Sequence, residues 1–153
     1  AADTQYHDTY FVVAHFHYVM VAGAVFSGTA AVYYWLPKWC GRMYDETMGK
    51  VQFWIAFIAF NITFMPQHFL GLAGMPRRYS DYGLQFADWN MVSSIGAFMY
   101  GGAQLLFLFN VIRTIGWGKP IDDPKVWEGA EGLEWTLPTP APFHTFSTPP
   151  VLK

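Results

Sequence analysis

Cysteine and charged residues are both scarce in this sequence. Cys40 is the single cysteine among 153 residues, so no disulfide can form within the chain and no thiolate metal cluster can be built from it. We expect Cys40 to be a small packing residue. Only 13% of the residues are charged, the formal net charge is −2, and the basic residues form no dense run. This distribution argues against a nucleic-acid partner and against a polybasic membrane anchor.

Apolar side chains are abundant instead. They make up 53% of the residues, and aromatic side chains make up 20%, which is unusual for a soluble domain and favours a membrane protein. From Tyr10 to Leu36 there is no Asp, Glu, Lys, Arg or Pro. At about 1.5 Å of rise per residue, this stretch exceeds the roughly 30 Å hydrocarbon core of a bilayer. We predict a transmembrane helix that ends at Pro37.

Two further apolar segments predict two more membrane spans. One runs from Val51 to Phe64, and it reaches Leu72 if Pro66 is tolerated near its end. The other lies between 89 and 115 and carries small residues suited to close helix packing. The predicted fold class is therefore all-α integral membrane, with three transmembrane helices. The expected segments are a lead-in at 1–9, spans at 10–36, 51–72 and 89–115, connections at 37–50 and 73–88, and an extended Pro-rich tail at 116–153.

Basic residues are divided unevenly between the two sides that three spans define. Arg77 and Arg78 lie in the second connection, on the side of the N-terminus. The other side holds Lys38, Arg42, Lys50, Arg113, Lys119, Lys125 and Lys153. By the positive-inside rule, that richer side faces the cytoplasm or the mitochondrial matrix. Arg77 and Arg78 then form a basic pair on the opposite side, neutralised in a solvated loop by Asp81 and Asp88 unless an anionic group lies at that surface.

Two histidines interrupt the first apolar span. Polar side chains within a membrane usually face a bundle interior, a cavity or a cofactor. Two residues along a helix correspond to about 200° of rotation and about 3 Å of rise, so His15 and His17 point to opposite faces and cannot easily share one metal ion. On a strand they would share a face, but the length and lack of polar alternation argue against a strand. The pair indicates either hydrogen bonds to neighbouring helices or two cofactors that flank one helix.

Heme is a cofactor that suits this arrangement. A neutral imidazole nitrogen is a normal axial ligand of heme iron, and heme propionates at one membrane face would supply anions for Arg77 and Arg78. His7 and Asp8 precede the span on the same side. An imidazole beside a carboxylate suits a divalent ion such as Mg²⁺. The alternative is that Asp8 caps the following helix or interacts with its dipole.

Three segments of the sequence resemble a known family. They are HDTYFVVAHFHYVM at 7–20, FMPQHFLGLAGMPRRYSDY at 64–82 and NMVSS from Asn90. They resemble subunit I of cytochrome c oxidase, the catalytic subunit of the heme-copper oxygen reductases, and the similarity covers nearly the whole chain in order. The resemblance implies the last three helices of a twelve-helix bundle. It also implies four-electron reduction of oxygen to water coupled to proton pumping.

The resemblance assigns roles to the histidine segment. It implies that His15 is the axial ligand of a high-spin heme A, whose open position faces a copper ion. It implies that His17 is one of two axial ligands of a low-spin heme A, and that Phe16 lies between the two hemes. For Phe16, ordinary aromatic packing remains the alternative. His68 is expected to be structural and His144 to lie at the surface.

The resemblance also assigns roles to the polar residues near the N-terminal side. It implies that Arg77 and Arg78 bind heme propionates. It implies that His7 and Asp8 help to bind a magnesium ion. Asp3 is expected to belong to the propionate hydrogen-bond network near the proton exit.

The expected partners follow from the same resemblance. Ubiquinol oxidases share the AHFH core, but they typically lack the pair formed here by His7 and Asp8 and the MPRRYSDY motif. Cytochrome c is therefore the expected electron donor. Electrons would arrive through the binuclear copper centre of subunit II, and subunit III and membrane lipid are further expected partners. The expected location is the mitochondrial inner membrane, with a bacterial plasma membrane as the alternative.

Several groups that the family needs are missing from this sequence. They are three histidines for the copper ion, a tyrosine cross-linked to one of them, and a second histidine for the low-spin heme. We therefore expect no activity from the isolated chain and expect a companion N-terminal part of subunit I, as in a split subunit whose C-terminal piece is made separately. Two alternatives remain open: a membrane scaffold or assembly piece without a cofactor role, and a standalone heme or ion-transport protein.

Overall fold

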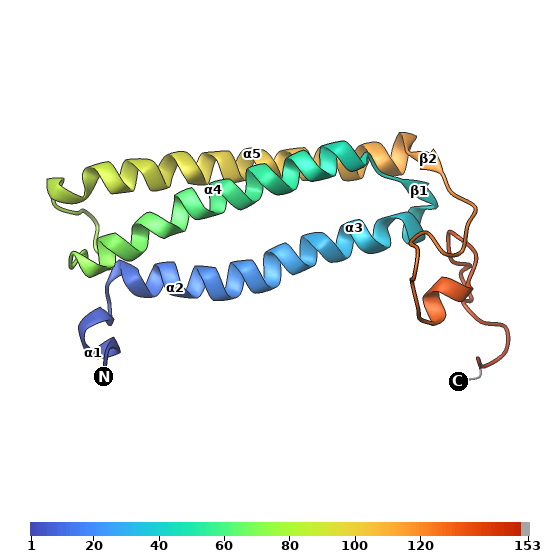
Figure 1. Cartoon of the computed structure of the whole chain (residues 1–153), viewed down its shortest axis with the longest axis horizontal. Coiled ribbons are helices and arrows are strands. Elements are labelled where there is room, and N and C mark those ends of the chain that lie inside the picture. Colours follow the sequence, from blue (N-terminus) through green and yellow to red (C-terminus); the bar gives the residue numbers. More distant parts are fainter. Residues whose placement is uncertain (151–153) are drawn as a thin grey trace.

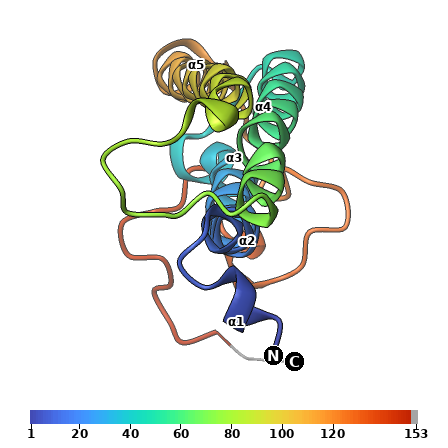
Figure 2. The same ribbon diagram turned by 90° about the vertical axis from the view of Figure 1, so that its left-hand side faces the viewer.

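Three long helices lie side by side in the structure (Figures 1 and 2), a computed structural model that describes residues 1–150. Three helical segments are long and apolar enough to cross a membrane: Tyr10–Cys40, Glu46–Leu72 and Leu84–Trp117. The predicted all-α membrane fold class with three spans is therefore confirmed. Lys153, which was counted on the basic side, lies outside the described residues.

The first span consists of three helical pieces that follow one another. They are α2 (Tyr10–Met20), a π-helical segment (Val21–Phe26) and α3 (Ser27–Cys40). The uninterrupted apolar run predicts one regular α-helix, and nothing in it marks the π-helical segment. The small residues Ala22, Gly23 and Ala24 leave room for its wider turn.

Pro37 does not end the first span, contrary to the prediction. The helix α3 continues to Cys40 and ends at Gly41, whose φ is +67° and whose N–H donates to the Pro37 carbonyl over 2.8 Å. A proline removes one backbone donor but does not itself supply a terminator. Glycine in the left-handed conformation does, because it carries no Cβ.

The second span begins at a charged turn that the apolar criterion omits. The helix α4 covers Glu46–Leu72, and Asp45 caps it by accepting a hydrogen bond from the Met48 N–H over 2.9 Å. Arg113 also donates to the Asp45 carboxylate over 3.0 Å. The pKa of Asp45 lies below its ordinary value, chiefly because of the hydrogen bond from the Met48 N–H and secondly because of Arg113. Pro66 lies inside α4, which continues to Leu72.

The second helix packs closely against both of the other spans. The third span comprises a 3-10 turn (Leu84–Phe86) and α5 (Ala87–Trp117). A Cβ added at Gly96 of α5 would lie 2.6 Å from the Thr63 nitrogen of α4, and one added at Gly71 of α4 would overlap the Phe11 backbone of α2. These two glycines permit the close approach of the helix backbones.

The ends of the bundle are closed by short contacts between distant segments. At one end in Figure 1, the strand β1 (Arg42–Met43) pairs antiparallel with β2 (Lys119–Pro120). The tail then crosses this end and contains a second 3-10 turn, Leu133–Thr136. The opposite end carries α1 (Asp3–Tyr6) and the 73–88 connection. The N-terminus and the second connection thus share one end, as three spans require.

Lys38 fastens the tail to the first span. Its side chain is only 3% exposed, and its ammonium group donates to the carbonyl oxygens of Pro124 (3.2 Å) and Leu137 (2.6 Å) and to the Thr139 hydroxyl (3.2 Å). The same nitrogen lies 5.6 Å from the centre of the Trp135 ring. Three oxygen acceptors and an aromatic face therefore replace the water that a buried ammonium group loses.

Candidate functional site

His15 and His17 lie on different faces of α2, as their spacing predicts. His17 faces α4, where its imidazole stacks on Phe64 with ring centres 4.2 Å apart and an interplanar angle of 14°. His15 is exposed, and so is Val19 one turn further along the same face. The faces of α2 on which the two imidazoles lie therefore have separate surroundings.

The hydrogen bond of His17 determines its tautomer. Its Nδ1 lies 2.7 Å from the carbonyl oxygen of Val13. A carbonyl can only accept, so Nδ1 carries a proton, and in the neutral imidazole Nε2 then keeps its lone pair. This is the tautomer that a histidine needs in order to bind a metal through Nε2. Within residues 1–150, Nε2 has no hydrogen-bond partner.

Phe16 contacts His17 directly. Their rings are stacked, with centres 4.3 Å apart. The His17 imidazole therefore stacks on two rings, Phe16 at an interplanar angle of 30° and Phe64 at 14°. The contact agrees with aromatic packing and equally with a place beside a cofactor that His17 binds.

A charged cluster forms around Asp8 at the N-terminal end of α2. One carboxylate oxygen lies 3.4 Å from Nε2 of His7, and the other lies 3.8 Å from Arg77 and 4.0 Å from Arg78. Asp3 completes the cluster at 3.9 Å from Nδ1 of His7. The structure therefore brings together the five residues on this side for which the resemblance implies a role in binding magnesium or the heme propionates.

Backbone pairing holds the cluster in place. Thr9 and Pro76 form an isolated antiparallel bridge, and the N–H of Arg77 donates to the Asp8 carbonyl over 2.8 Å. Asp8 and Arg78 both have positive φ, at 56° and 65°. For residues other than glycine such angles cost about 1–3 kcal/mol each, and they persist where the surroundings impose them. The bridge is that constraint here.

The structure excludes a capping role for Asp8 and an ion pair between Asp81 and the arginines. Asp8 does not cap α2, because the Thr9 hydroxyl accepts the Phe11 N–H over 3.3 Å. Within residues 1–150, Asp81 forms no ion pair with either arginine, and its carboxylate accepts the Tyr82 N–H instead. In the described part of the chain the carboxylate that pairs with both arginines is that of Asp8, and Asp88 forms no ion pair.

The cluster is open to solvent. The His7 side chain is 71% exposed and that of Arg78 is 74% exposed, whereas Arg77 is 20% exposed. Exposed ion pairs contribute only about 0–1 kcal/mol each, so these contacts add little to the stability of the fold. The arginines therefore remain available for a stronger anion.

His7 and Asp8 fit a part of a magnesium site, and not a complete one. Nowhere in residues 1–150 do three or more His, Cys, Asp or Glu side chains converge as metal ligands do. The two candidate ligand atoms of His7 and Asp8 lie 3.4 Å apart. Adjacent ligands of an octahedral Mg²⁺ with bonds of about 2.1 Å lie roughly 3 Å apart. Water or another chain must supply the other ligands.

The sequence analysis missed two residues of α4 that contact α2, Asn61 and Phe64, and expected a third, His68, to be structural. Phe64 stacks on His17, the Asn61 amide oxygen accepts the Tyr18 hydroxyl over 2.7 Å, and His68 lies edge-on to Tyr18 with ring centres 5.3 Å apart. The ring nitrogen Nδ1 of His68 is buried without a partner among the described residues. Their spacing along one helix face was the available signal.

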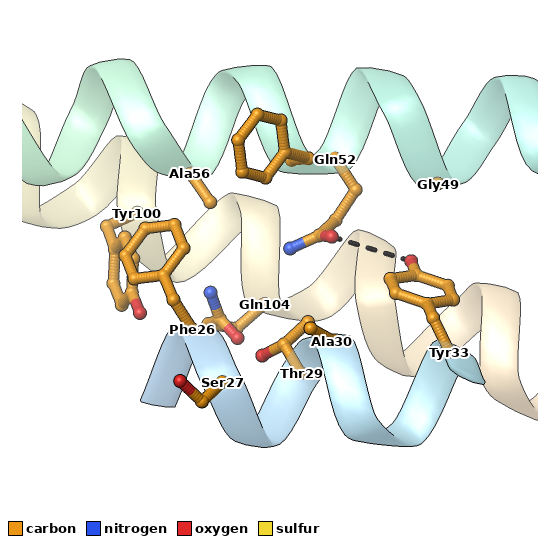
Figure 3. A pocket seen from close by; sticks show the side chains of 11 residues that line it. Phe26, Ser27, Thr29, Ala30, Tyr33, Gly49, Gln52, Ala56, Tyr100 and Gln104 are labelled. Atoms are coloured by element: carbon orange, nitrogen blue, oxygen red, sulfur yellow. Dashed lines mark hydrogen bonds between the residues drawn. The ribbon is translucent and has the colours of Figure 1, made fainter. Parts of the chain in front are cut away.

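A cavity of about 390 Å³ lies between α3, α4 and α5, away from this site (Figure 3). The Tyr33 hydroxyl donates to the Gln52 side-chain oxygen across it, over 3.4 Å. Tyr100 and Gln104 also line it, and none of the predicted site residues does.

Known proteins are similar to this chain over nearly its whole length. Residues 1–99 match the family model described as Cytochrome C and Quinol oxidase polypeptide I. The chain belongs to this family. Among curated members, the cytochrome c oxidase subunit 1 of Cereibacter sphaeroides is 52% identical over 151 residues, which cover 98% of this chain and 27% of that protein.

Other members of the polypeptide I family give the same picture. The cytochrome c oxidase subunit 1 of Bacillus sp. (strain PS3) is 47% identical over 156 residues, covering 100% of this chain and 25% of the relative. A putative cytochrome c oxidase subunit 1-beta of Streptomyces avermitilis is 45% identical over 148 residues, covering 95% and 26%. The chain thus spans about a quarter of the length of the curated relatives it matches.

Proposed function

We propose that this chain is the C-terminal part of the oxygen-reducing subunit of a cytochrome c oxidase and supplies one axial histidine to each of two hemes. The arrangement of His15 and His17 carries the proposal. His17 offers a free Nε2 lone pair, fixed by the Val13 carbonyl, and His15 offers its ring on the other face. Family membership supports the oxidase role.

Each residue of the segment has a definite task in this proposal. Hemes bound at the two histidines, with copper beside the high-spin one, would pass on electrons from cytochrome c and bind oxygen for O₂ + 4 e⁻ + 4 H⁺ → 2 H₂O, coupled to proton pumping. His17 and His15 hold and orient them. Phe16, between the two histidines in sequence, separates their surroundings, and exposed apolar side chains such as Val19 exclude water once covered.

The charged cluster serves the same cofactors. Arg77 and Arg78 donate charge-assisted hydrogen bonds to heme propionates, which are stronger than their present contacts of 3.8 and 4.0 Å with Asp8. Asp8 and His7 would hold Mg²⁺, for which their candidate ligand atoms lie 3.4 Å apart. Asp3 stays within reach of His7 and belongs to the same hydrogen-bond network.

Other polypeptide segments complete the site. Earlier helices of subunit I, on the same or a separate chain, supply the copper ligands and the second histidine of the low-spin heme. Subunit II with its binuclear copper centre, subunit III, lipid and cytochrome c are the further partners. The large exposed apolar faces of the three helices support this assembly, because single-chain surfaces in water rarely expose so much. The membrane is the mitochondrial inner membrane or a bacterial plasma membrane.

Two substitutions in the assembled oxidase test the proposal. His15→Ala should abolish the reaction of the high-spin heme with carbon monoxide, and His17→Ala should abolish the optical bands of the low-spin heme. His144→Ala, an exposed histidine of the tail, is the matched control and should leave both signals unchanged. Normal spectra in both site variants would contradict the proposal and favour a scaffold.

A further inference from the structure

The helix α4 presents a row of side chains to α2 at the level of His17. Asn61 holds the Tyr18 hydroxyl, Phe64 stacks on His17, and His68 lies edge-on to Tyr18. The Asn61 side-chain nitrogen in turn donates to the Phe57 carbonyl over 2.9 Å, so its oxygen is oriented toward Tyr18. These contacts fix the rotation of α2 about its own axis relative to α4.

The Val13 hydrogen bond alone does not fix the plane of the His17 imidazole. It anchors one ring nitrogen, and the ring can still tilt about the line from Nδ1 to the carbonyl. Stacked rings restrict that freedom, and the contact with Phe64, at 4.2 Å and 14°, is closer to parallel than the contact with Phe16, at 4.3 Å and 30°. A second aromatic ring, Phe60, lies 5.0 Å from Phe64 at 52° and supports it from its own helix.

We infer that Phe64 is a positioning residue that sets the plane of the His17 imidazole and thereby tunes the low-spin heme that His17 binds. The inference rests on the proposed function, because it takes His17 as the ligand. Groups that orient a ligating histidine change the electronic properties of the metal without touching it. For heme, the orientation and basicity of the axial ligand are among the variables that the protein controls.

A merely structural role for Phe64 makes a different prediction. A core-filling phenylalanine would affect assembly and stability but not the electronic signature of one heme. The geometry favours positioning, because Phe64 covers a face of the imidazole itself, and its removal would leave the Val13 hydrogen bond in place while freeing that face.

The test uses electron paramagnetic resonance of the oxidised, fully assembled oxidase. Phe64→Leu should shift the largest g value of the low-spin heme and leave the carbon monoxide reaction of the high-spin heme unchanged. Phe64→Tyr, which keeps the ring, should restore the wild-type g value. Phe57→Leu is the matched control, because Phe57 lies on the same helix and stacks on Phe53 rather than on His17.

The g values of the Phe64 variants distinguish a positioning role from a structural one. If Phe64→Leu binds both hemes with wild-type g values, the inference is wrong, while loss of the low-spin heme in His17→Ala would still uphold the proposed function. If Phe64→Leu does not assemble, Phe64→Met keeps most of the side-chain volume without a ring and is measured in its place. Failure of both non-aromatic variants to assemble would show a folding role and would also overturn the inference.

Discussion

The ammonium nitrogen of Lys38 lies 2.6 Å from the carbonyl oxygen of Leu137, which is 99 residues later in the chain. This contact joins the end of the first span to the tail. Because the ammonium group is buried, its removal leaves carbonyl oxygens without a donor.

Lys38→Met should release the tail from the bundle. The methionine keeps the apolar stem and deletes the charge, and we expect a loss of about 3 kcal/mol in the local stability of the tail, since hydrogen bonds to charged groups contribute about 1.5–3 kcal/mol each. Hydrogen exchange of the 124–139 amides in the assembled oxidase measures the effect. Lys125→Met, at an exposed lysine of the same end, should leave exchange unchanged; equal protection in Lys38→Met would contradict the role of Lys38.

Gly71→Ala should separate α2 from α4. The added Cβ overlaps backbone atoms of Phe11, which cannot move away as a flexible side chain would. Overpacking costs about 1–3 kcal/mol, so we expect poorer assembly and less bound low-spin heme. Gly116→Ala is the control, because an added Cβ there meets no atom within 4 Å. A normal heme content in Gly71→Ala would show that the two helices can shift apart freely.

Asp8→Asn should weaken the metal site without disturbing the backbone. Asparagine tolerates positive φ, so the conformation at 56° is kept while the charge is lost. We expect Mg²⁺ or substituted Mn²⁺ to bind at least about tenfold more weakly, since even groups next to the ligands change affinity by 10–100-fold. Mn²⁺ resonance spectra measure the occupancy. Asp81→Asn serves as the control, and unchanged Mn²⁺ binding in Asp8→Asn would remove Asp8 from the site.

Asp45 should make the stability of α4 depend on pH. Its pKa in the folded chain lies below the ordinary value of 3.8. A lowered pKa means that the contribution is present above pH 3.8 and is lost as the pH falls through the lower, folded value. Thermal unfolding of the assembled oxidase from pH 7 to pH 3 should show a smaller acid-induced loss in Asp45→Asn than in the wild type. Asparagine still caps a helix, so it isolates the charge; identical pH profiles would contradict the assignment.

The spans could be predicted from the sequence, but their ends could not. A run without charge from Tyr10 to Leu36 leaves little choice but a membrane helix. The ends depend on individual hydrogen bonds instead. The Asp45 cap brings the charged first turn of α4 into the helix, and Gly41 rather than Pro37 terminates α3.

Part of the candidate site could likewise be predicted from the sequence, and part could not. The separation of His15 and His17 onto two faces follows from helix geometry alone, so spacing was sufficient. The contact between Asp8 and the arginines depends on the bridge between Thr9 and Pro76, which joins segments far apart in the sequence. The stacking of Phe64 on His17 depends on how α2 is rotated against α4, and no local pattern encodes that rotation.

The π-helical segment at Val21–Phe26 changes which residues of the first span share a helix face, and it affects how the span tolerates deletions. A π-helical turn contains one residue more than an α-helical turn. This extra residue rotates the side chains that follow by about 100° around the helix axis. A helical wheel that starts at His15 therefore misassigns the faces of α3 beyond Phe26. A single-residue deletion within 21–26 can be absorbed by a return to the regular repeat, whereas the same deletion before Met20 would move His15 and His17 out of phase with α4.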